Sequence, residues 1–272
     1  MIMWDPTTYP DAKGIADLGT AKVKVRYFGG AAYMDFLTST GILSKDQVDG
    51  SYTGDPTLFI ADEGKSAQQG FGSAEPFAYE SDLKDANGKA LWGKKVAYEY
   101  INDIGWKNYA ESIATRPENV TKYADCFKKL VPIIQQASVD YVNSPANANA
   151  VILDAVAQFG KDFGWSYSQA NADYGVKTIK ADGLVANGTD GVMGSFDEAR
   201  VTDLIATGVV ERHPRLKFVL VENEISWLPF VLTQCDKYAA RGTFSSPMTL
   251  SPSEYFRRNF YATFFNDPPS AW

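Results

Sequence analysis

The pattern of apolar and polar residues near the start of the chain predicts a strand, a glycine turn and a helix. Residues 22–28 alternate apolar with basic side chains, which is typical of a half-exposed strand. Gly29 and Gly30 follow, and residues 33–37 then predict a helix that stops at Gly41. Because a helix start has free backbone N–H groups, this order predicts donors that point into a cleft at the strand end.

The rest of the chain continues the alternation of strands and helices. Apolar residues between positions 120 and 141 recur at steps of three and four, which predicts an amphipathic helix. Further helices are predicted at 146–159, 169–181 and 225–240, and another is expected to start at residues 195–198 and to run through Ile205. Further strands are predicted at 68–71, 95–101, 216–221 and 258–265. Capping-box spacing is present at Ser195 to Glu198 and again at Ser251 to Glu254. This alternation predicts an α/β class with a largely parallel sheet.

Composition narrows the classes of protein that fit. Of the 272 residues, 45% are hydrophobic and 22% are charged, which is a globular balance rather than a disordered, collagen-like or coiled-coil one. The length predicts one large domain or two smaller ones. No apolar run approaches the roughly 18 residues that a membrane span needs. The net charge of −7 argues against nucleic acid as a partner.

Histidine and cysteine usage argues against metal and nucleophilic chemistry. Zinc sites and serine-type triads depend on histidine, and His213, which precedes a proline among charged residues and is expected to face solvent, is the chain's one histidine. Cys126 and Cys235 have no CxxC spacing and are expected to be buried thiols. No glycine-rich nucleotide motif is complete. The sequence therefore predicts no catalytic residue, no metal and no cofactor.

The turns after the predicted strands carry the candidate binding chemistry. Gly29 and Gly30 either cradle an anionic or polar head group or form a tight turn that needs positive φ. The acids Asp5, Glu75 and Asp103 either pair with a cationic ligand or cap backbone N–H groups. Aromatic residues at these positions either line a ligand crevice or pack loops over the core: Trp4, Tyr27, Phe28, Tyr33, Phe77 and Trp106.

Residues 1–206 resemble the solute-binding proteins of ABC importers, in the group that captures nitrate, sulfonates, taurine and thiamine precursors. The segments that carry the resemblance are 1–6, 25–30, 69–76, 131–137, and 188–191 with 195–197. The resemblance implies the periplasmic-binding-protein-like fold of two α/β lobes joined by a hinge. The first lobe is incomplete, the ligand lobe is expected at about residues 15–115, and a helical return segment is expected at 116–206.

The same resemblance implies a binding site and a partner. Ligand contacts would come from the predicted helix start, from the hinge side, from the side opposite the hinge, and from the first strand: Gly29, Gly30, Ala31 and Tyr33; Ser73 and Glu75; Asp103 and Trp106; Trp4 and Asp5. It implies a small-molecule solute, a membrane permease as partner, a monomer, and a periplasmic location. Because residues 1–6 lack the features of a signal peptide, a literal interpretation of this chain instead predicts the cytoplasm.

Residues 207–272 resemble a different family, the metal-dependent amidohydrolases, in the group of aminocarboxymuconate-semialdehyde decarboxylase. Residues 211–218, 227–229, 253–256 and 263–265 carry this resemblance, which implies late strands of a TIM barrel. The early HxH metal pair of that family and its late metal-binding Asp have no counterpart here. Where some relatives place a metal-binding histidine, residues 221–224 read Val-Glu-Asn-Glu.

Three hypotheses follow. The first is a binding module for a small solute, weakened because lobe closure supplies much of the burial. The second is a metal-dependent hydrolase or decarboxylase that lacks its ligands. The third is a non-functional fusion product in which the C-terminal residues fill the place of lost lobe strands.

Overall fold

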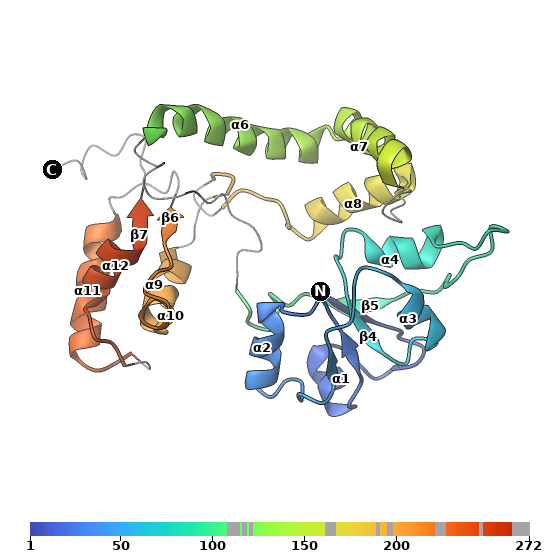
Figure 1. The fold of residues 1–272 in the computed structure, drawn as a ribbon, viewed down its shortest axis with the longest axis horizontal. Coiled ribbons are helices and arrows are strands. Elements are labelled where there is room, and N and C mark those ends of the chain that lie inside the picture. Colours follow the sequence, from blue (N-terminus) through green and yellow to red (C-terminus); the bar gives the residue numbers. More distant parts are fainter. Residues whose placement is uncertain are drawn as a thin grey trace. The chain divides into compact units, whose positions relative to one another are not determined.

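The computed structural model describes two compact units (Figure 1). The described residues are 1–107, 115, 119, 122–160, 167–188, 191–194, 198–220, 227–244 and 247–262. The first unit contains residues 1–108 and 141–184, and the second contains 109–140 and 185–272. This division does not coincide with the boundary between 206 and 207 that the resemblances imply. Among the described residues, no helix has both the length and the apolar character that a membrane span requires.

The first unit is built on a five-stranded sheet in the order β3-β2-β4-β1-β5. The strands are β1 (Ile2–Trp4), β2 (Val25–Arg26), β3 (Val48–Asp49), β4 (Ala67–Gln69) and β5 (Ala97–Glu99). β2 pairs in parallel with β3 and β4, whereas β1 is antiparallel to both β4 and β5. The α/β class is thus confirmed, but the expected largely parallel sheet is mixed because β1 runs the other way. The carboxyl ends of the other four strands meet at one edge.

Each face of this sheet is covered by helices. On one face, α1 (Ile15–Thr20) and α2 (Ala32–Ser39) supply Ile15, Leu18, Met34 and Leu37 to a core that includes Val25. On the other face lie α3 (Thr57–Ala61), α4 (Glu75–Phe77) and the π-helix η1 (Ala78–Asp82). This second core is smaller and contains four buried residues: Met3, Phe59, Tyr79 and Val96. Burial of these side chains from water stabilises both layers.

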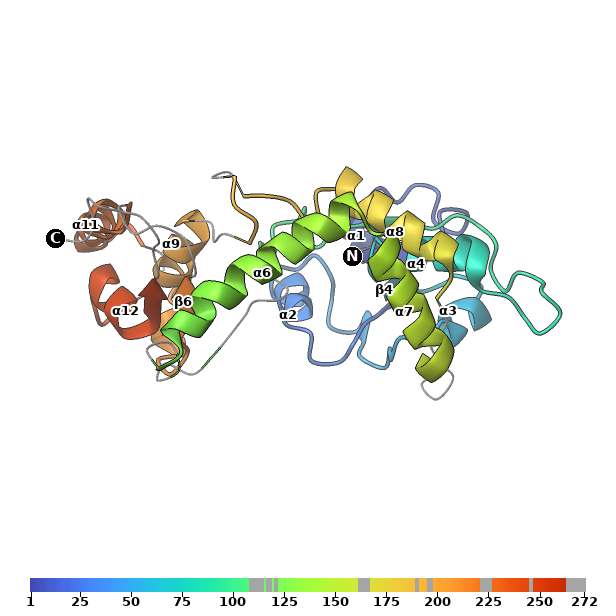
Figure 2. The same cartoon turned by 90° about the horizontal axis from the view of Figure 1, so that it is seen from above.

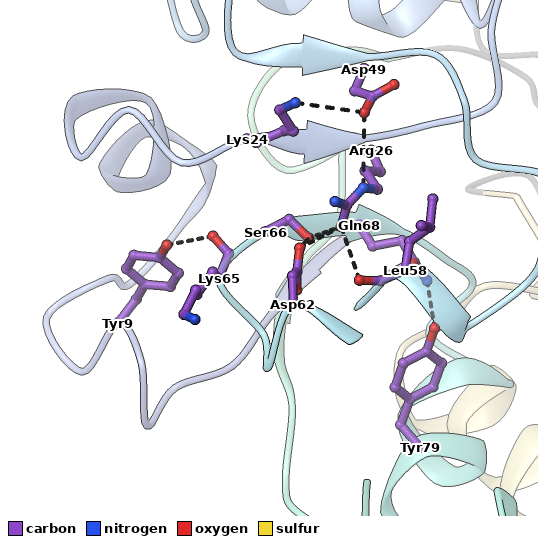
Figure 3. Close-up of polar contacts among 10 residues, drawn as sticks. All are labelled: Tyr9, Lys24, Arg26, Asp49, Leu58, Asp62, Lys65, Ser66, Gln68 and Tyr79. Carbon is purple, nitrogen blue, oxygen red and sulfur yellow. Dashed lines mark hydrogen bonds and ion pairs between the residues drawn. The ribbon is translucent and has the colours of Figure 1, made fainter. Parts of the chain in front are cut away.

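A row of polar side chains crosses the second face in register (Figure 3). Asp49, Arg26 and Gln68 are Cα partners on β3, β2 and β4. Nη1 of Arg26 lies 2.6 Å from Oδ2 of Asp62 and also contacts the Ser66 hydroxyl. Because a half-buried guanidinium needs such partners, this network fixes the loop after α3 to the sheet.

The helices of residues 146–181 return to the first unit. α7 (Ala146–Phe159) and α8 (Gln169–Ala181) have the bounds that the sequence predicts. α8 lies beside α4 in both views (Figures 1 and 2), where the ring of Tyr174 stacks on Phe77 with centroids 5.3 Å apart. The Tyr174 hydroxyl donates to the Gly72 carbonyl at 3.1 Å. α8 therefore supports the turn that follows β4.

The second unit packs helices around a two-stranded parallel sheet. Its elements are α9 (Glu198–Ala206), α10 (Val209–Arg212), β6 (Phe218–Leu220), α11 (Trp227–Ala240), α12 (Pro252–Asn259) and β7 (Phe260–Ala262), and α6 (Ala124–Asn143) belongs to both units. Val201 and Ile205 of α9 share a buried cluster with Val210, Tyr255 and Phe256. The segment before residue 207 is thus part of the same core as the segment after it.

The predicted capping box of α12 is confirmed. Ser251 Oγ accepts from the Glu254 N–H at 3.4 Å, and the Glu254 carboxylate accepts from the Ser251 N–H at 2.8 Å. The predicted last strand starts at Phe260 rather than at 258, because α12 continues through Asn259. Residues 195–197 of the other capping box and residues 263–265 lie outside the described residues.

Candidate functional site

The predicted helix start lies at the edge where the parallel strands of the first unit end. Gly30 has φ of +88° and an added Cβ there would meet nothing within 4 Å, so its front is open. An added Cβ at Gly29 would lie 2.9 Å from the Gly50 carbonyl oxygen, so the two loops approach closely. The two glycines therefore form the tight turn with positive φ that was one of the two interpretations of this segment. The turn also leaves open space at the strand end.

The start of α2 has no side-chain cap. Ala31 occupies the N-cap position, and its methyl group cannot accept a hydrogen bond. Within the described residues, the N–H groups of Gly29, Gly30, Ala32 and Tyr33 have no hydrogen-bond partner. These four donors and the helix dipole favour an acceptor group in front of them.

Gln69, at the end of β4, links this helix start to the neighbouring strand. Its Oε1 accepts from the Phe28 N–H at 2.9 Å and from the Tyr33 hydroxyl at 2.5 Å. Burial raises the pKa of Tyr33, which therefore stays a donor. With Oε1 held from two sides, the amide NH₂ of Gln69 remains without a partner among the described residues and is a fifth donor at this edge.

Ser73 and Glu75 follow β4 at the same edge. The Glu75 carboxylate is half-buried and its Oε2 accepts from the Phe71 N–H at 2.7 Å. Burial raises the pKa of Glu75 above its ordinary value, against the effect of its hydrogen bonds. Ser73 lies under α8, since an added Cβ at Gly175 would be 2.9 Å from its carbonyl oxygen.

Asp103 and Trp106 lie on the turn after β5. The Trp106 ring packs on Phe36 of α2 with centroids 5.4 Å apart, so this turn is joined to the helix one turn beyond its start. Asp103 is exposed, and its side chain accepts a hydrogen bond from Asn102 at 3.3 Å. Within the described residues no hydrogen bond, ion pair or ring contact connects either residue with Gln69 or Glu75.

Trp4 and Asp5 lie at the opposite edge, because β1 is antiparallel to its neighbours. Trp4 is 2% exposed and belongs to the main core. Asp5 is 1% exposed, and it accepts from the Thr7 N–H at 2.8 Å, the Thr8 hydroxyl at 3.0 Å and Lys94 Nζ at 3.1 Å. The structure therefore does not bring these two residues to the other eight predicted contacts.

Three contributors to the edge were not among the predicted contacts, namely Phe28, Gln69 and Tyr52. Phe28 was noted as a strand-end aromatic, and its ring packs on Tyr52 with centroids 4.9 Å apart. Tyr52 follows a strand of two residues that no alternation revealed. The position of Gln69 within the predicted strand 68–71, directly before Gly70, was the one available signal.

The histidine and the cysteines occupy separate places. His213 is exposed, as expected, at an open hollow of about 700 Å³ lined by Arg212, Pro214, Arg215 and Leu216. Cys235 is buried, whereas Cys126 is exposed, so the expectation of a buried thiol was wrong for Cys126. In the described part of the chain, no three or more His, Cys, Asp or Glu side chains gather where they could hold a metal ion.

Comparison of the chain with protein-family models, with curated proteins and with solved structures found no match.

Proposed function

We propose that the first unit binds a small solute at the carboxyl edge of its sheet. The observation that carries the proposal is the uncapped start of α2, where four backbone N–H groups have no described acceptor and Gln69 is bonded through its Oε1 to Phe28 and Tyr33. Ligands of open α/β sheets bind at this edge, outside the carboxyl ends of the strands. The donors favour an anionic or polar acceptor group of the solute, and the neighbouring aromatic rings would cover its apolar part.

The resemblance of residues 1–206 to solute-binding proteins of ABC importers extends this proposal. It supplies the biological role, which is delivery of the solute to a membrane permease, and with it a periplasmic location and a monomeric state. No separate observation favours an amidohydrolase activity for residues 207–272.

A thermal melt of the whole chain tests the proposal, with pooled solutes (nitrate, sulfonates, pyrimidines and aromatic acids) at millimolar concentration. A solute present at 100 times its Kd stabilises the native state by about 2.7 kcal/mol, which raises the midpoint by several degrees. The shift should be lost in Gln69→Ala and kept in Gln169→Ala, a control on the exposed surface of α8.

The other outcomes separate the alternatives. A cooperative melt that no pool moves contradicts solute binding. The absence of any cooperative transition supports a non-functional fusion product.

A further inference from the structure

Residues 212–217 of the second unit, from the end of α10 to the start of β6, gather positive charge at one place. Four of these six residues are arginine, lysine or histidine, although the whole chain has a net charge of −7: Arg212, His213, Arg215 and Lys217. All four residues are exposed, and none forms an ion pair with an acid in the described part of the chain. A surface of one sign attracts ligands of the other.

Hydrogen bonds from α12 hold this segment in one shape. Asn259 is 0% exposed, and its Nδ2 donates to the carbonyls of Leu216 at 2.6 Å and Pro214 at 3.3 Å. Its Oδ1 accepts from Arg258 Nε at 2.8 Å, and Lys217 Nζ contacts the Arg258 carbonyl. Because the backbone is already fixed, a ligand that binds here does not have to order it.

The fold leaves two side chains of this segment unused. Neither the His213 ring nor the Arg215 guanidinium makes a hydrogen bond with a described residue, whereas Arg212 Nη1 donates to the Thr207 carbonyl at 2.9 Å. The acid directly before the segment is engaged elsewhere.

Glu211 is that acid. Its carboxylate accepts from the Thr249 hydroxyl at 3.0 Å, contacts the Tyr255 hydroxyl and interacts electrostatically with Arg258 of α12. These partners lie on other segments, so Glu211 does not neutralise His213 or Arg215.

The unused side chains line a hollow. It has a volume of about 700 Å³ and is lined by Arg212, His213, Pro214, Arg215 and Leu216. This volume lies in the range of small-molecule sites. A guanidinium donates two parallel N–H bonds to a phosphate group, a geometry that a lysine cannot reproduce. Pro214 and Leu216 add apolar surface to the same hollow.

A cation would be repelled at this place. A phosphate monoester carries nearly two negative charges and three acceptor oxygens at pH 7, which suits two guanidinium groups and an imidazole. We propose that Arg212, His213 and Arg215 bind the phosphate group of a small phosphorylated molecule. Its apolar body would lie against Pro214 and Leu216. This site belongs to the second unit and does not depend on the proposed solute site of the first.

Calorimetric titration of the whole chain at low salt tests the site with phenyl phosphate, inorganic phosphate and phenol. We expect phenyl phosphate to bind most tightly, inorganic phosphate more weakly, and phenol not measurably. Arg215→Gln should weaken phenyl phosphate about tenfold, as the loss of charge-assisted hydrogen bonds does. Arg241→Gln is the matched control, because Arg241 is an exposed arginine of the same unit whose guanidinium lies over the Tyr238 ring.

A variant of the first unit separates the two proposals. Gln69→Ala should leave the affinity for phenyl phosphate unchanged, since Gln69 belongs to the edge at the start of α2. If Gln69→Ala weakens phenyl phosphate and Arg215→Gln does not, the anion binds at that edge and the inference is wrong.

Three further results would overturn the inference. They are equal affinities of Arg215→Gln and Arg241→Gln, phenol binding as tightly as phenyl phosphate, and no binding of phenyl phosphate. If phenyl phosphate fails while a pooled solute still shifts the melt, the phosphate site is wrong and solute binding stands. Melts of the variants without probe verify that each is folded.

Discussion

Two helices of eight residues, one in each unit, begin in opposite ways. α12 starts with a complete capping box, in which Ser251 and Glu254 satisfy each other's backbone N–H groups. α2 starts at Ala31 with no side-chain cap, and the N–H groups of Ala32 and Tyr33 have no described partner. A capped start contributes to stability, whereas an uncapped start leaves its donors available to a ligand.

The buried tyrosines of the two units differ in the same way. The Tyr255 hydroxyl in the second unit accepts from the N–H groups of Thr249 at 2.8 Å and Leu250 at 3.2 Å, and it contacts Glu211. The Tyr52 hydroxyl in the first unit makes no hydrogen bond to the described residues, and it is not among the buried polar atoms that lack a partner. The polar groups around Tyr255 thus serve the fold of the second unit, while the sheet edge of the first unit retains unused donors.

The largest expected effect tests this difference between the tyrosines. Tyr255→Phe should lower the free energy of unfolding by about 2–3 kcal/mol, because two backbone N–H groups lose their acceptor. Tyr52→Phe should cost less than about 1 kcal/mol, since it removes an oxygen that makes no bond. Urea unfolding of both variants measures this, and equal losses would remove the distinction.

Asp5 and Glu75 are two acids of the first unit whose pKa values shift in opposite directions. Burial opposes ionisation of Asp5, but hydrogen bonds from Thr7, Lys94 and Thr8 outweigh it and lower the pKa of Asp5. Asp5→Asn should therefore reduce stability at pH 7 by about 2 kcal/mol, as expected for a hydrogen-bonded charge.

The effect of Asp5 should depend on pH. Its folded pKa lies below its unfolded pKa, so its contribution is complete above the unfolded pKa and is lost as pH falls through the folded pKa. Urea unfolding between pH 7 and pH 2 should show the wild type and Asp5→Asn converging at the acid end. A constant difference across that range would mean that the lowered pKa does not stabilise the fold.

Removal of the cap of α12 should have a moderate effect. Ser251→Ala should reduce stability by about 1 kcal/mol, the usual cost of losing an N-cap side chain. The same unfolding assay reports it, with Ser39→Ala on the exposed end of α2 as the control. A loss no greater than that of Ser39→Ala would show that the capping box does not stabilise α12.

Addition of a cap to α2 should have the smallest effect on stability and the opposite sign. Ala31→Ser should raise stability by about 0.5–1 kcal/mol, because the hydroxyl satisfies an N–H group at the helix start. The same substitution should weaken binding of the solute that shifts the melt, since the serine hydroxyl competes with the solute for that N–H group. A gain in stability with unchanged affinity would place the solute elsewhere.

Periodicity and capping residues predicted the helices better than the strands. α7 and α8 match their predicted bounds, because each has a regular apolar face and a recognisable start. The strands have two or three residues each. Alternation over residues 22–28 therefore predicted a strand longer than β2, which contains only Val25 and Arg26. β1 and β3 are too short to show any period, and the antiparallel direction of β1 depends on contacts with β4 and β5.

The site could be predicted where it depends on local chain geometry. The turn at Gly29 and Gly30 and the helix after it were identified from the sequence. The roles of Gln69 and Tyr52 arise from neighbours distant in sequence, Phe28 and Tyr33 among them, and no local pattern reveals such pairs. Trp4 and Asp5 lie at the opposite edge from the other predicted contacts, because β1 is antiparallel to its neighbours, and the sequence does not reveal the direction of a strand.

Amide NMR of the whole chain, recorded as the pooled solutes are added, tests the edge site most directly. We predict that the N–H signals of Gly29, Gly30, Ala32 and Tyr33 shift most and that those of Ser251 and Glu254 at the capped helix stay in place. A melt that shifts while these four signals do not move, or changes centred on the second unit, would contradict solute binding at the start of α2.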